Sequence, residues 1–242
     1  MPGRAGFRLP PAGLLFLAVP DAAVRDMARR IARMEPPPEL SVVHVSGALG
    51  LDALDALKQN PRGSFHPLQS FPTARDPTAF GGITVAIDAT TPALRKRLEG
   101  LARQLGARPR HVGDSERVRY HAAAVFASNF VDVVIAEAVA LLRSAGWTEA
   151  AAMEALMPLV EGAVENIRRR GPVRALTGPI RRGDADTVER HLKVMNDPGL
   201  YRMLALAALQ IAIKAGLDPP AAERTRRALT RDVAATRRRG RR

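Results

Sequence analysis

The stretch Gly13-Leu-Leu-Phe-Leu-Ala-Val-Pro-Asp21 decides how the fold is read from this sequence. Its residues from Leu14 to Val19 are all apolar, which is typical of a strand that is covered on both faces of a sheet. Pro20-Asp21 ends this run, and residues 22–34 then carry apolar side chains with helical spacing. A buried strand that leads directly into an amphipathic helix predicts a parallel α/β sheet.

The same alternation continues along the chain and then stops. Further strands are expected at 41–45, 63–66, 83–87 and 108–112, with helices at 51–59 and 92–106. From about residue 118 every apolar pattern is helical, with helices expected at 119–144, 148–170, 186–195, 198–216 and 219–236. The sequence therefore predicts a mostly parallel, layered α/β sheet followed by an all-α bundle, with the boundary near residues 114–117.

Composition limits the function classes. The chain carries a net charge of +13, but residues 224–242 alone hold nine arginines and one aspartate, so most of the excess is in this Arg-rich tail. Only 4% of the residues are aromatic, and none is interleaved with that tail, as single-strand binding would require. A solvated tail is expected; a basic, nucleic-acid-associated protein is the alternative, and it is rejected if deleting 224–242 leaves nucleic-acid affinity unchanged.

Cysteine usage and the apolar runs bear on the compartment. The chain has no cysteine, so it has neither a disulfide framework nor a thiolate site. The longest purely apolar runs are too short to cross a bilayer, and residues 1–11 lack the apolar core of a signal peptide. We therefore expect a cytoplasmic protein that does not span a membrane.

An unusual helix lies between Ala122 and Leu142, where polar side chains interrupt an otherwise apolar surface. Those polar residues are Ser128, Asn129, Asp132 and Glu137. A helix that is apolar almost all round is buried, either in a core or against a partner. We therefore expect a homodimer formed through the helical domain, and a site where buried polar groups gather on this helix.

Several strings in this order resemble a bacterial family of oxidoreductases that join an N-terminal Rossmann-like domain to a helical DUF2520 domain. The strings are Leu17–Asp21, His44–Gly47, Ser64–Gln69, Tyr120–Phe130, Pro158–Asn166 and Leu176–Asp184. The architecture is also similar, at one remove, to ketopantoate reductases, 3-hydroxyacid dehydrogenases and pyrroline-5-carboxylate reductases. The resemblance implies NADP (or NAD) in a cleft between the domains and reduction of a small carbonyl or imine. It divides the chain into a vestigial segment 1–12, a truncated Rossmann-like domain 13–115, a helical domain 116–223 and the tail.

The sequence departs from that family at its start. A Rossmann domain begins with a strand and a G-x-G-x-x-G turn that receives the pyrophosphate, and only Gly3-Arg-Ala-Gly6 offers a trace of it. The strand at Leu14–Val19 corresponds to the family's fourth, so the first half of the nucleotide site is expected to be missing, either deleted or lost to a start codon assigned too late. We therefore expect an apolar strand at an open sheet edge and weak or no dinucleotide binding. The alternative function is an inactive homologue that acts as a helical dimerisation module.

The ends of the first strands supply the candidate cofactor-binding residues. By the resemblance these are Val19, Pro20, Asp21, His44, Ser46 and Gly47. In open α/β sheets ligands bind beyond the carboxyl ends of the strands, and a glycine allows close approach of the backbone. A simpler interpretation is a strand-to-helix turn with Asp21 as the N-cap, and histidines that bond only to nearby backbone. No metal is expected, because no two histidines have ligand spacing.

The helix itself supplies the candidate catalytic residues, His121 and Asn129. His121 has the intrinsic pKa of a general acid and could protonate a carbonyl oxygen as hydride arrives at carbon. His66 and Ser128 are candidate substrate-binding residues, and Thr177 with Arg181 could hold a substrate carboxylate. For each of them a purely structural role is the alternative: a packed histidine, or a turn between helices with a solvated arginine.

Overall fold

The computed structural model of the protein describes residues 8–71, 73 and 76–231. The segment Gly3–Gly6 and most of the Arg-rich tail, residues 232–242, lie outside this described part. The chain forms two compact units, residues 1–133 and 134–242. The first unit therefore extends beyond residues 114–117, because the helix that begins at Asp114 packs on the sheet through the buried side chain of Arg117.

The first unit is built on a five-stranded sheet whose order follows the sequence. Its strands are β1 (Gly13–Leu17), β2 (Leu40–His44), β3 (Arg62–Pro67), β4 (Thr84–Ala89) and β5 (Arg108–His111). The pairs β1–β2, β2–β3 and β4–β5 are parallel, and only β3–β4 is antiparallel. The predicted mostly parallel sheet is confirmed. The carboxyl ends of β1, β2 and β3 lie at the same end of the sheet, and the amino ends of β4 and β5 lie there too.

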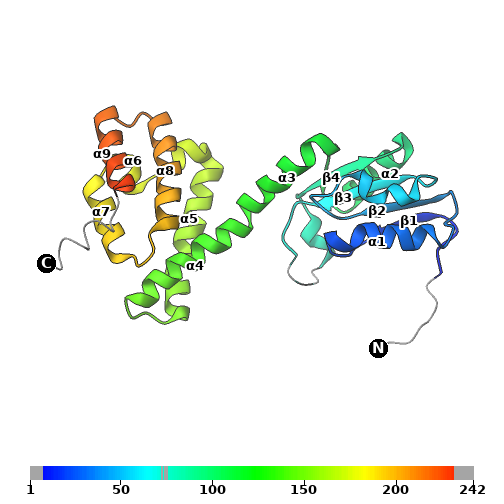
Figure 1. The fold of residues 1–242 in the computed structure, drawn as a ribbon, viewed down its shortest axis with the longest axis horizontal. Helices are drawn as coiled ribbons and strands as arrows, with labels where there is room; N and C mark the ends of the chain where they lie inside the picture. Colours follow the sequence, from blue (N-terminus) through cyan, green and yellow to red (C-terminus); the bar gives the residue numbers. More distant parts are fainter. Residues whose placement is uncertain (1–7, 72, 74–75, 232–242) are drawn as a thin grey trace. The chain divides into compact units, whose positions relative to one another are not determined.

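Helices cover both faces of this sheet, so the unit has three layers (Figure 1). On one face, α1 (Asp21–Ala32) and η1 (Leu51–Leu57) pack against Val42 and Leu17. On the other face, α2 (Pro92–Gln104) packs against Val43 and Phe65, and the short η2 (Pro77–Phe80) adds Phe80 to that cluster. Neighbouring residues of β2 thus face opposite cores, as alternation along a strand requires.

The two edge strands differ in character. Strand β1 pairs only with β2 among the described residues, which confirms the expected open, apolar edge. The ring of Phe16 is 36% exposed there and meets Phe65 edge-to-face at 5.8 Å. At the opposite edge β5 reads Arg108-Pro-Arg-His111, and charges and proline protect an edge against pairing.

The expected helix over residues 119–144 is instead two helices, α3 (Asp114–Ala127) and α4 (Asn129–Ser144). The break lies at Ser128, whose φ of −126° and ψ of −78° leave the helical region and end the hydrogen-bond ladder of α3. The next helix, α5 (Glu149–Ala175), begins at a Thr148 cap, and its hydroxyl accepts from the Ala151 amide at 3.2 Å. Gly171 interrupts α5 with φ +73°, at the position where the sequence predicted its end.

The second unit has its own core, formed by the last four helices of the described chain. These are α6 (Gly178–Arg182), α7 (Ala185–Val194), α8 (Gly199–Lys214) and α9 (Pro219–Thr230). Ile180, Val188, Leu192, Leu209 and Leu229 are buried together there. The predicted helical bundle is confirmed, and the first arginines of the Arg-rich segment belong to α9.

Many apolar residues of α3 and α4 are exposed in the described part of the chain, so neither unit by itself covers Ala122–Leu142, and the expected dimer stays a prediction. Phe126 is 69% exposed, and Phe130, Val133 and Val134 are also exposed. Of the described residues, the segment Asp114–Ser144 alone is long and apolar enough to cross a membrane, with only 6% of its most apolar part buried. A single such segment is weak evidence for a span, and its most apolar part is almost uncovered by the residues that the structure describes.

Candidate functional site

A row of polar side chains crosses the middle of the sheet at a level where apolar residues would be expected. His44 of β2 pairs in register with Ser64 of β3, and Ser64 pairs with Asp88 of β4. Residues directly opposite on neighbouring strands point to the same face of a sheet. All three are buried, His44 and Ser64 completely. Buried polar groups need partners, so this row requires something polar to cover it.

Arg117 of α3 provides that cover. Its side chain is only 1% exposed, and its guanidinium donates to the Ser64 hydroxyl at 2.6 Å and to the Val112 carbonyl at 2.9 Å. A longer contact of 3.5 Å reaches the carbonyl of Ser46, beyond the end of β2. Burial lowers the pKa of Arg117, while the carboxylates of Asp88 and Asp114 oppose that effect. Because arginine stays protonated in proteins, a fixed positive charge lies at this end of the sheet.

That charge acts on His44, one of the candidate cofactor-binding residues. Burial, reinforced by the Arg117 charge, lowers the pKa of His44 to about 4, so its imidazole is neutral at physiological pH. Its Nε2 lies 3.2 Å from the carbonyl of Gly50, and since a carbonyl only accepts, Nε2 must carry the proton. His44 therefore fastens the loop after β2 to the strand, as the structural interpretation of this histidine expected.

The same loop is closed by Ser46. Its hydroxyl accepts from the amides of Ala48 and Leu49 at 3.2 and 3.0 Å, and its side chain is buried. These bonds fix the turn that carries Gly47. The geometry thus gives Ser46 a role in shaping the loop, and a contact with a cofactor stays a prediction.

Beyond this loop His66, Tyr120 and His121 form a cluster, and the two imidazoles approach Gly47. His66, at the carboxyl end of β3, lies 2.9 Å through Nδ1 from the hydroxyl of Tyr120, and the two rings meet edge-to-face. The rings of His66 and His121 have centroids 6.2 Å apart. A Cβ placed on Gly47 would lie 2.7 Å from His66 Nε2 and 2.8 Å from His121 Nδ1. Only glycine at this position allows the two imidazoles to approach the backbone so closely.

Burial shifts the pKa values of His66 and Tyr120, and His121 differs from both in having a buried nitrogen without a hydrogen-bond partner in the described part of the chain. Burial lowers the pKa of His66 to about 4, assisted by His121 and by the charge of Arg117. Burial raises the pKa of Tyr120 to about 12. At neutral pH both His66 and Tyr120 are therefore uncharged. His121 Nδ1 is buried and has no hydrogen-bond partner among the described residues, and such an orphaned atom in a native structure is often explained by an absent ligand or water.

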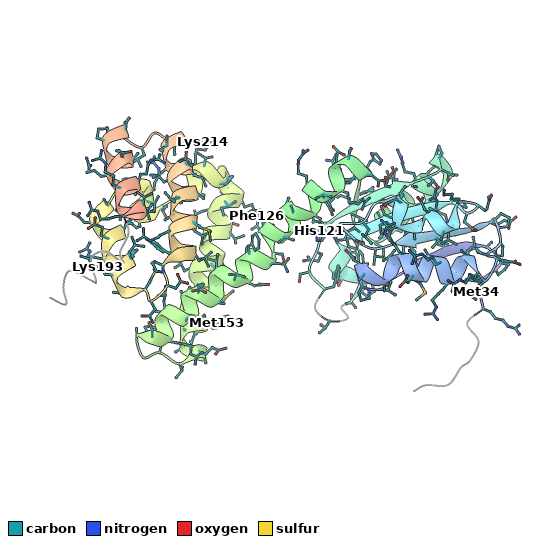
Figure 2. All side chains as sticks on the ribbon, in the orientation of Figure 1. Met34, His121, Phe126, Met153, Lys193 and Lys214 are labelled. Carbon is teal, nitrogen blue, oxygen red and sulfur yellow. The ribbon has the colours of Figure 1, made fainter. Side chains whose placement is uncertain are left out.

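A cavity of about 560 Å³ opens beside this cluster. Its polar lining is supplied by His66, Gln69, Ser70, Tyr120, His121, Ser128 and Asn129, and its apolar lining by Leu68 and the alanine-rich face of α3. Figure 2 shows all described side chains and labels His121 and Phe126 on α3. The volume is in the range of small-molecule pockets, and the polar groups lie at the carboxyl end of β3, where such sheets bind ligands.

Four of the predicted site residues are therefore brought together: His66, His121, Ser128 and Asn129 line one cavity. Gly47 touches the first two. Val19 and Pro20 follow β1, and helix α1 begins at Asp21 itself, so Asp21 is its first residue and Pro20 occupies the N-cap. The Asp21 charge nonetheless reaches His44 and His66, whose pKa values it raises slightly against the dominant effect of burial.

The remaining two predicted residues belong to the other compact unit. Thr177 is the N-cap of α6, and its side chain makes no capping bond. The guanidinium of Arg181 donates to the carbonyl of Ala215 at 2.9 Å, which ties α6 to the end of α8. A carboxylate-binding role for this pair stays a prediction.

Sequence reasoning missed Arg117, Tyr120 and Asp88. A signal for the first two was present, because Arg117 lies four residues before His121 and on the same face of the helix. Asp88 gave none, since its position opposite Ser64 follows from an antiparallel pairing that the sequence did not reveal.

The described residues fit one end of a nicotinamide dinucleotide better than the other. The loops after β1, β2 and β3 and the orphaned His121 Nδ1 offer a place for the reacting end. Three α-helices directly follow strands in the described part: α1 after Val19-Pro20, α2 after Thr90-Thr91 and α3 after Val112-Gly113. None of these junctions is a glycine-rich turn that cradles a pyrophosphate. For metals, no group of three or more potential ligands occurs within the described ranges.

Comparison with known proteins places the chain in a family. The family described as Domain of unknown function (DUF2520) matches residues 83–211, more than half of the sequence, and the protein belongs to it. No curated protein matches the chain in sequence.

Solved structures extend the comparison to the whole fold. A "putative NADP oxidoreductase" from Bacteroides fragilis has a TM-score of 0.72 and 25% identity, over 85% of this chain and 77% of the other. Protein TM1727 from Thermotoga maritima has a TM-score of 0.69 and 22% identity, over 86% and 81%. Pyrroline carboxylate reductase from Plasmodium falciparum, solved with NADP bound, has a TM-score of 0.54 and 11% identity, over 90% and 77%. The chain thus has the Rossmann-like fold that NADP-dependent reductases share.

Proposed function

We propose that the protein is an NADP- or NAD-dependent oxidoreductase that reduces a small carbonyl or imine substrate, with His121 as the proton donor. The observation that carries the proposal is the convergence of His121 and His66 beside Gly47, in a cavity at the carboxyl end of a parallel strand. The resemblance to NADP oxidoreductases supports the reaction class. A reduced nicotinamide, when bound, supplies a hydride to the substrate carbon.

The protein's own residues then deliver a proton to the substrate oxygen. Reduction of a carbonyl leaves negative charge on oxygen, and a positioned acid that protonates it accelerates the reaction by roughly 10²–10⁴-fold. His121 lines the cavity, its own Nδ1 has no hydrogen-bond partner among the described residues, and the ring fits that task. Asn129, at the start of α4, lines the same cavity and would orient the substrate through its amide.

Steady-state reduction of a panel of aldehydes, ketones and cyclic imines by NADPH and by NADH tests this proposal. We expect turnover with at least one class and a loss of about 10²–10⁴-fold in kcat for His121→Gln. His191→Gln is the control, because His191 lies in the second unit and does not line this cavity. Equal activity of His121→Gln and wild type would contradict the assignment of the proton donor.

Affinity for the dinucleotide is a separate matter. We propose that this chain binds NADPH weakly, since the described residues offer no glycine-rich turn at a helix N-terminus to hold the pyrophosphate. Calorimetric titration of the full chain with NADPH measures this directly. Submicromolar binding would overturn the expectation and strengthen the enzymatic proposal.

A second candidate function is a helical dimerisation module without turnover, and the exposed apolar residues of α4 and α5 favour it. Leu159 is 70% exposed, and Val164 and Ile167 of the same helix are also exposed. Exposed apolar patches that exceed a few hundred Å² mark interaction sites. We propose that a second copy of the chain covers this surface in either case, so the two candidates differ only in whether the cavity turns over substrate.

A further inference from the structure

The cavity contains a second imidazole whose role the proposed function leaves open. Resting on that function, we propose that His66 is a catalytic residue that donates a hydrogen bond from Nε2–H to the substrate's carbonyl oxygen or imine nitrogen, and that Tyr120 is the positioning residue that holds it in this tautomer. His66 would then polarise the bond that is reduced, while His121 supplies the proton. Two histidines in one cavity thereby have different tasks.

The contact with Tyr120 fixes where the proton of His66 lies. The Tyr120 hydroxyl and His66 Nδ1 are 2.9 Å apart, so one of them donates to the other. Both groups are neutral, because burial disfavours the charged form of each. A phenol hydroxyl is a stronger hydrogen-bond donor than a neutral imidazole N–H, so Tyr120 donates and Nδ1 accepts. A neutral imidazole that accepts at one nitrogen carries its proton at the other, which is Nε2.

The surroundings of His66 also disfavour the charged imidazole as a proton source. Two groups from α3 lower its pKa, namely His121 and the buried cation of Arg117. Asp21 at the start of α1 opposes them, but its effect is the smallest of those that act on His66. With a pKa near 4, His66 is uncharged across the physiological range and can only offer a hydrogen bond. A neutral imidazole that polarises a carbonyl is an established catalytic device.

Gly47 directs both imidazoles to one place. His66 Nε2 and His121 Nδ1 both lie within 3 Å of the point that a side chain at position 47 would occupy. The two nitrogens therefore lie close to each other, packed against the Gly47 backbone, and both rings line the cavity. In this proposal a substrate oxygen bound in the cavity accepts from both rings.

The chemistry balances with these roles. As the carbonyl carbon gains a hydride, the electron pair of the C=O π bond moves to oxygen. That oxygen takes the proton held by His121 and becomes a hydroxyl, and His121 is reprotonated from solvent. The Nε2–H of His66 is not transferred; its hydrogen bond strengthens as negative charge develops on oxygen, which lowers the barrier.

The tautomer is tested without cofactor or substrate, by ¹⁵N NMR of the imidazole rings in the full chain at neutral pH. We expect His66 to be unprotonated at Nδ1 and protonated at Nε2, and Tyr120→Phe to convert it into a mixture of tautomers. Tyr201→Phe is the matched control, because Tyr201 pairs with His191 Nδ1 at the same 2.9 Å in the second unit. That variant is expected to change His191 and leave His66 as it was. A proton on Nδ1 of His66 in the wild type would overturn the proposal.

The catalytic role is tested by two substitutions of His66. Gln places an amide N–H near the position of Nε2 but cannot exchange a proton at neutral pH, whereas Leu removes the donor. We expect His66→Leu to lower kcat by roughly 10²–10³-fold and His66→Gln by less than roughly tenfold. Equal losses for the two variants would overturn the proposal. The NMR measurement needs no turnover, so it tests the tautomer of His66 even if the protein is not a reductase. A failure of the reductase proposal can therefore be distinguished from a failure of this one.

Discussion

Gly47 is the position at which a single added carbon has the clearest predicted effect. A Cβ there would lie 2.7 Å from His66 Nε2 and 2.8 Å from His121 Nδ1, closer than real Cβ contacts. We predict that Gly47→Ala displaces one or both imidazoles and lowers kcat at least about tenfold, because misplaced catalytic groups lose their alignment. Steady-state kinetics with the best substrate of the panel measures this.

Gly100 provides the control for that substitution. It lies in α2, and a Cβ there would meet nothing within 4 Å. Gly100→Ala is therefore expected to leave kinetics unchanged and to raise the free energy of unfolding by up to about 1 kcal/mol, as alanine favours helix. If Gly47→Ala and Gly100→Ala had the same kcat as the wild type, the close contacts at Gly47 would not matter for catalysis.

His44 makes stability depend on pH in a defined direction. Its pKa is about 4 in the folded chain and 6.5 in the unfolded one, so between these values the unfolded chain binds more protons. Stability is complete above pH 6.5 and falls as the pH drops toward 4, by about 3 kcal/mol from this residue. His66 contributes with the same sign. Urea unfolding at a series of pH values should show this loss.

The variant His44→Gln isolates one contribution. Its overall stability is expected to be lower, but the slope of stability against pH between 6.5 and 4.5 should be clearly smaller than in the wild type. The slope is the decisive quantity, because a general weakening of the fold would leave it unchanged. An identical slope would show that His44 is not neutral in the folded chain.

Arg117 is the α3 side chain with the most hydrogen bonds to the sheet and its loops. Arg117 links Ser64 of β3, Val112 after β5 and Ser46 after β2. Arg117→Met keeps the apolar stem but leaves buried oxygens without a donor, which costs about 1–3 kcal/mol for each such group. We predict a loss of at least about 2 kcal/mol in urea unfolding. Arg119→Met, at an exposed position of the same helix, should stay within about 0.5 kcal/mol of wild type.

The same variant has a second readout. Because the Arg117 charge lowers the pKa of both His44 and His66, its removal should raise both values, as followed by NMR titration. If Arg117→Met is too unstable to titrate, Arg117→Lys retains a charge and is expected to keep both pKa values low. Unchanged histidine pKa values in the Met variant would show that burial alone controls them.

The strands and helices were predictable where one local signal sufficed. The run Leu14–Val19 was recognisable as a strand because it is uniformly apolar, and Thr148 as a helix cap because a hydroxyl precedes the helix. The antiparallel β3–β4 pairing was not, since nothing in either strand encodes its direction. The break at Ser128 also escaped notice, because it depends on backbone angles and not on a proline or glycine.

The candidate site was predictable in its histidines but not in their partners. His66 and His121 stood out as polar residues at a strand end and on an apolar helix, and the cavity unites them. Their partners are distant in sequence: Tyr120 lies 54 residues from His66, and Arg117 lies 53 residues from Ser64. Such contacts follow from the docking of α3 on the sheet, and a single sequence does not encode that docking locally.

The exposed apolar residues of α4 and α5 predict that the chain is a dimer in solution. We expect light scattering at micromolar concentration to give twice the mass of the 242-residue chain, and Leu159→Asp to shift it toward monomer. Leu159 is 70% exposed, so this substitution should not cost stability in the isolated chain. Val118→Asp, equally exposed but on α3, is the control and should remain dimeric.

Other results would identify a different occupant of that surface. A wild-type chain that is monomeric and soluble at this concentration would contradict the dimer. Sedimentation with phospholipid vesicles would instead indicate that lipid covers the apolar segment Asp114–Ser144.

The contrast between the two sheet edges has a practical consequence. The main-chain amides and carbonyls of Gly13–Leu17 that do not bond to β2 have no strand partner among the described residues, while Arg108-Pro-Arg-His111 forms the opposite edge. An apolar peptide of about five residues, supplied in trans, should therefore dock along β1 and extend the sheet by one strand. Binding of such a peptide would raise the melting temperature of the protein and reduce its aggregation during heating. A reporter group could then be attached to the protein through the peptide bound along β1.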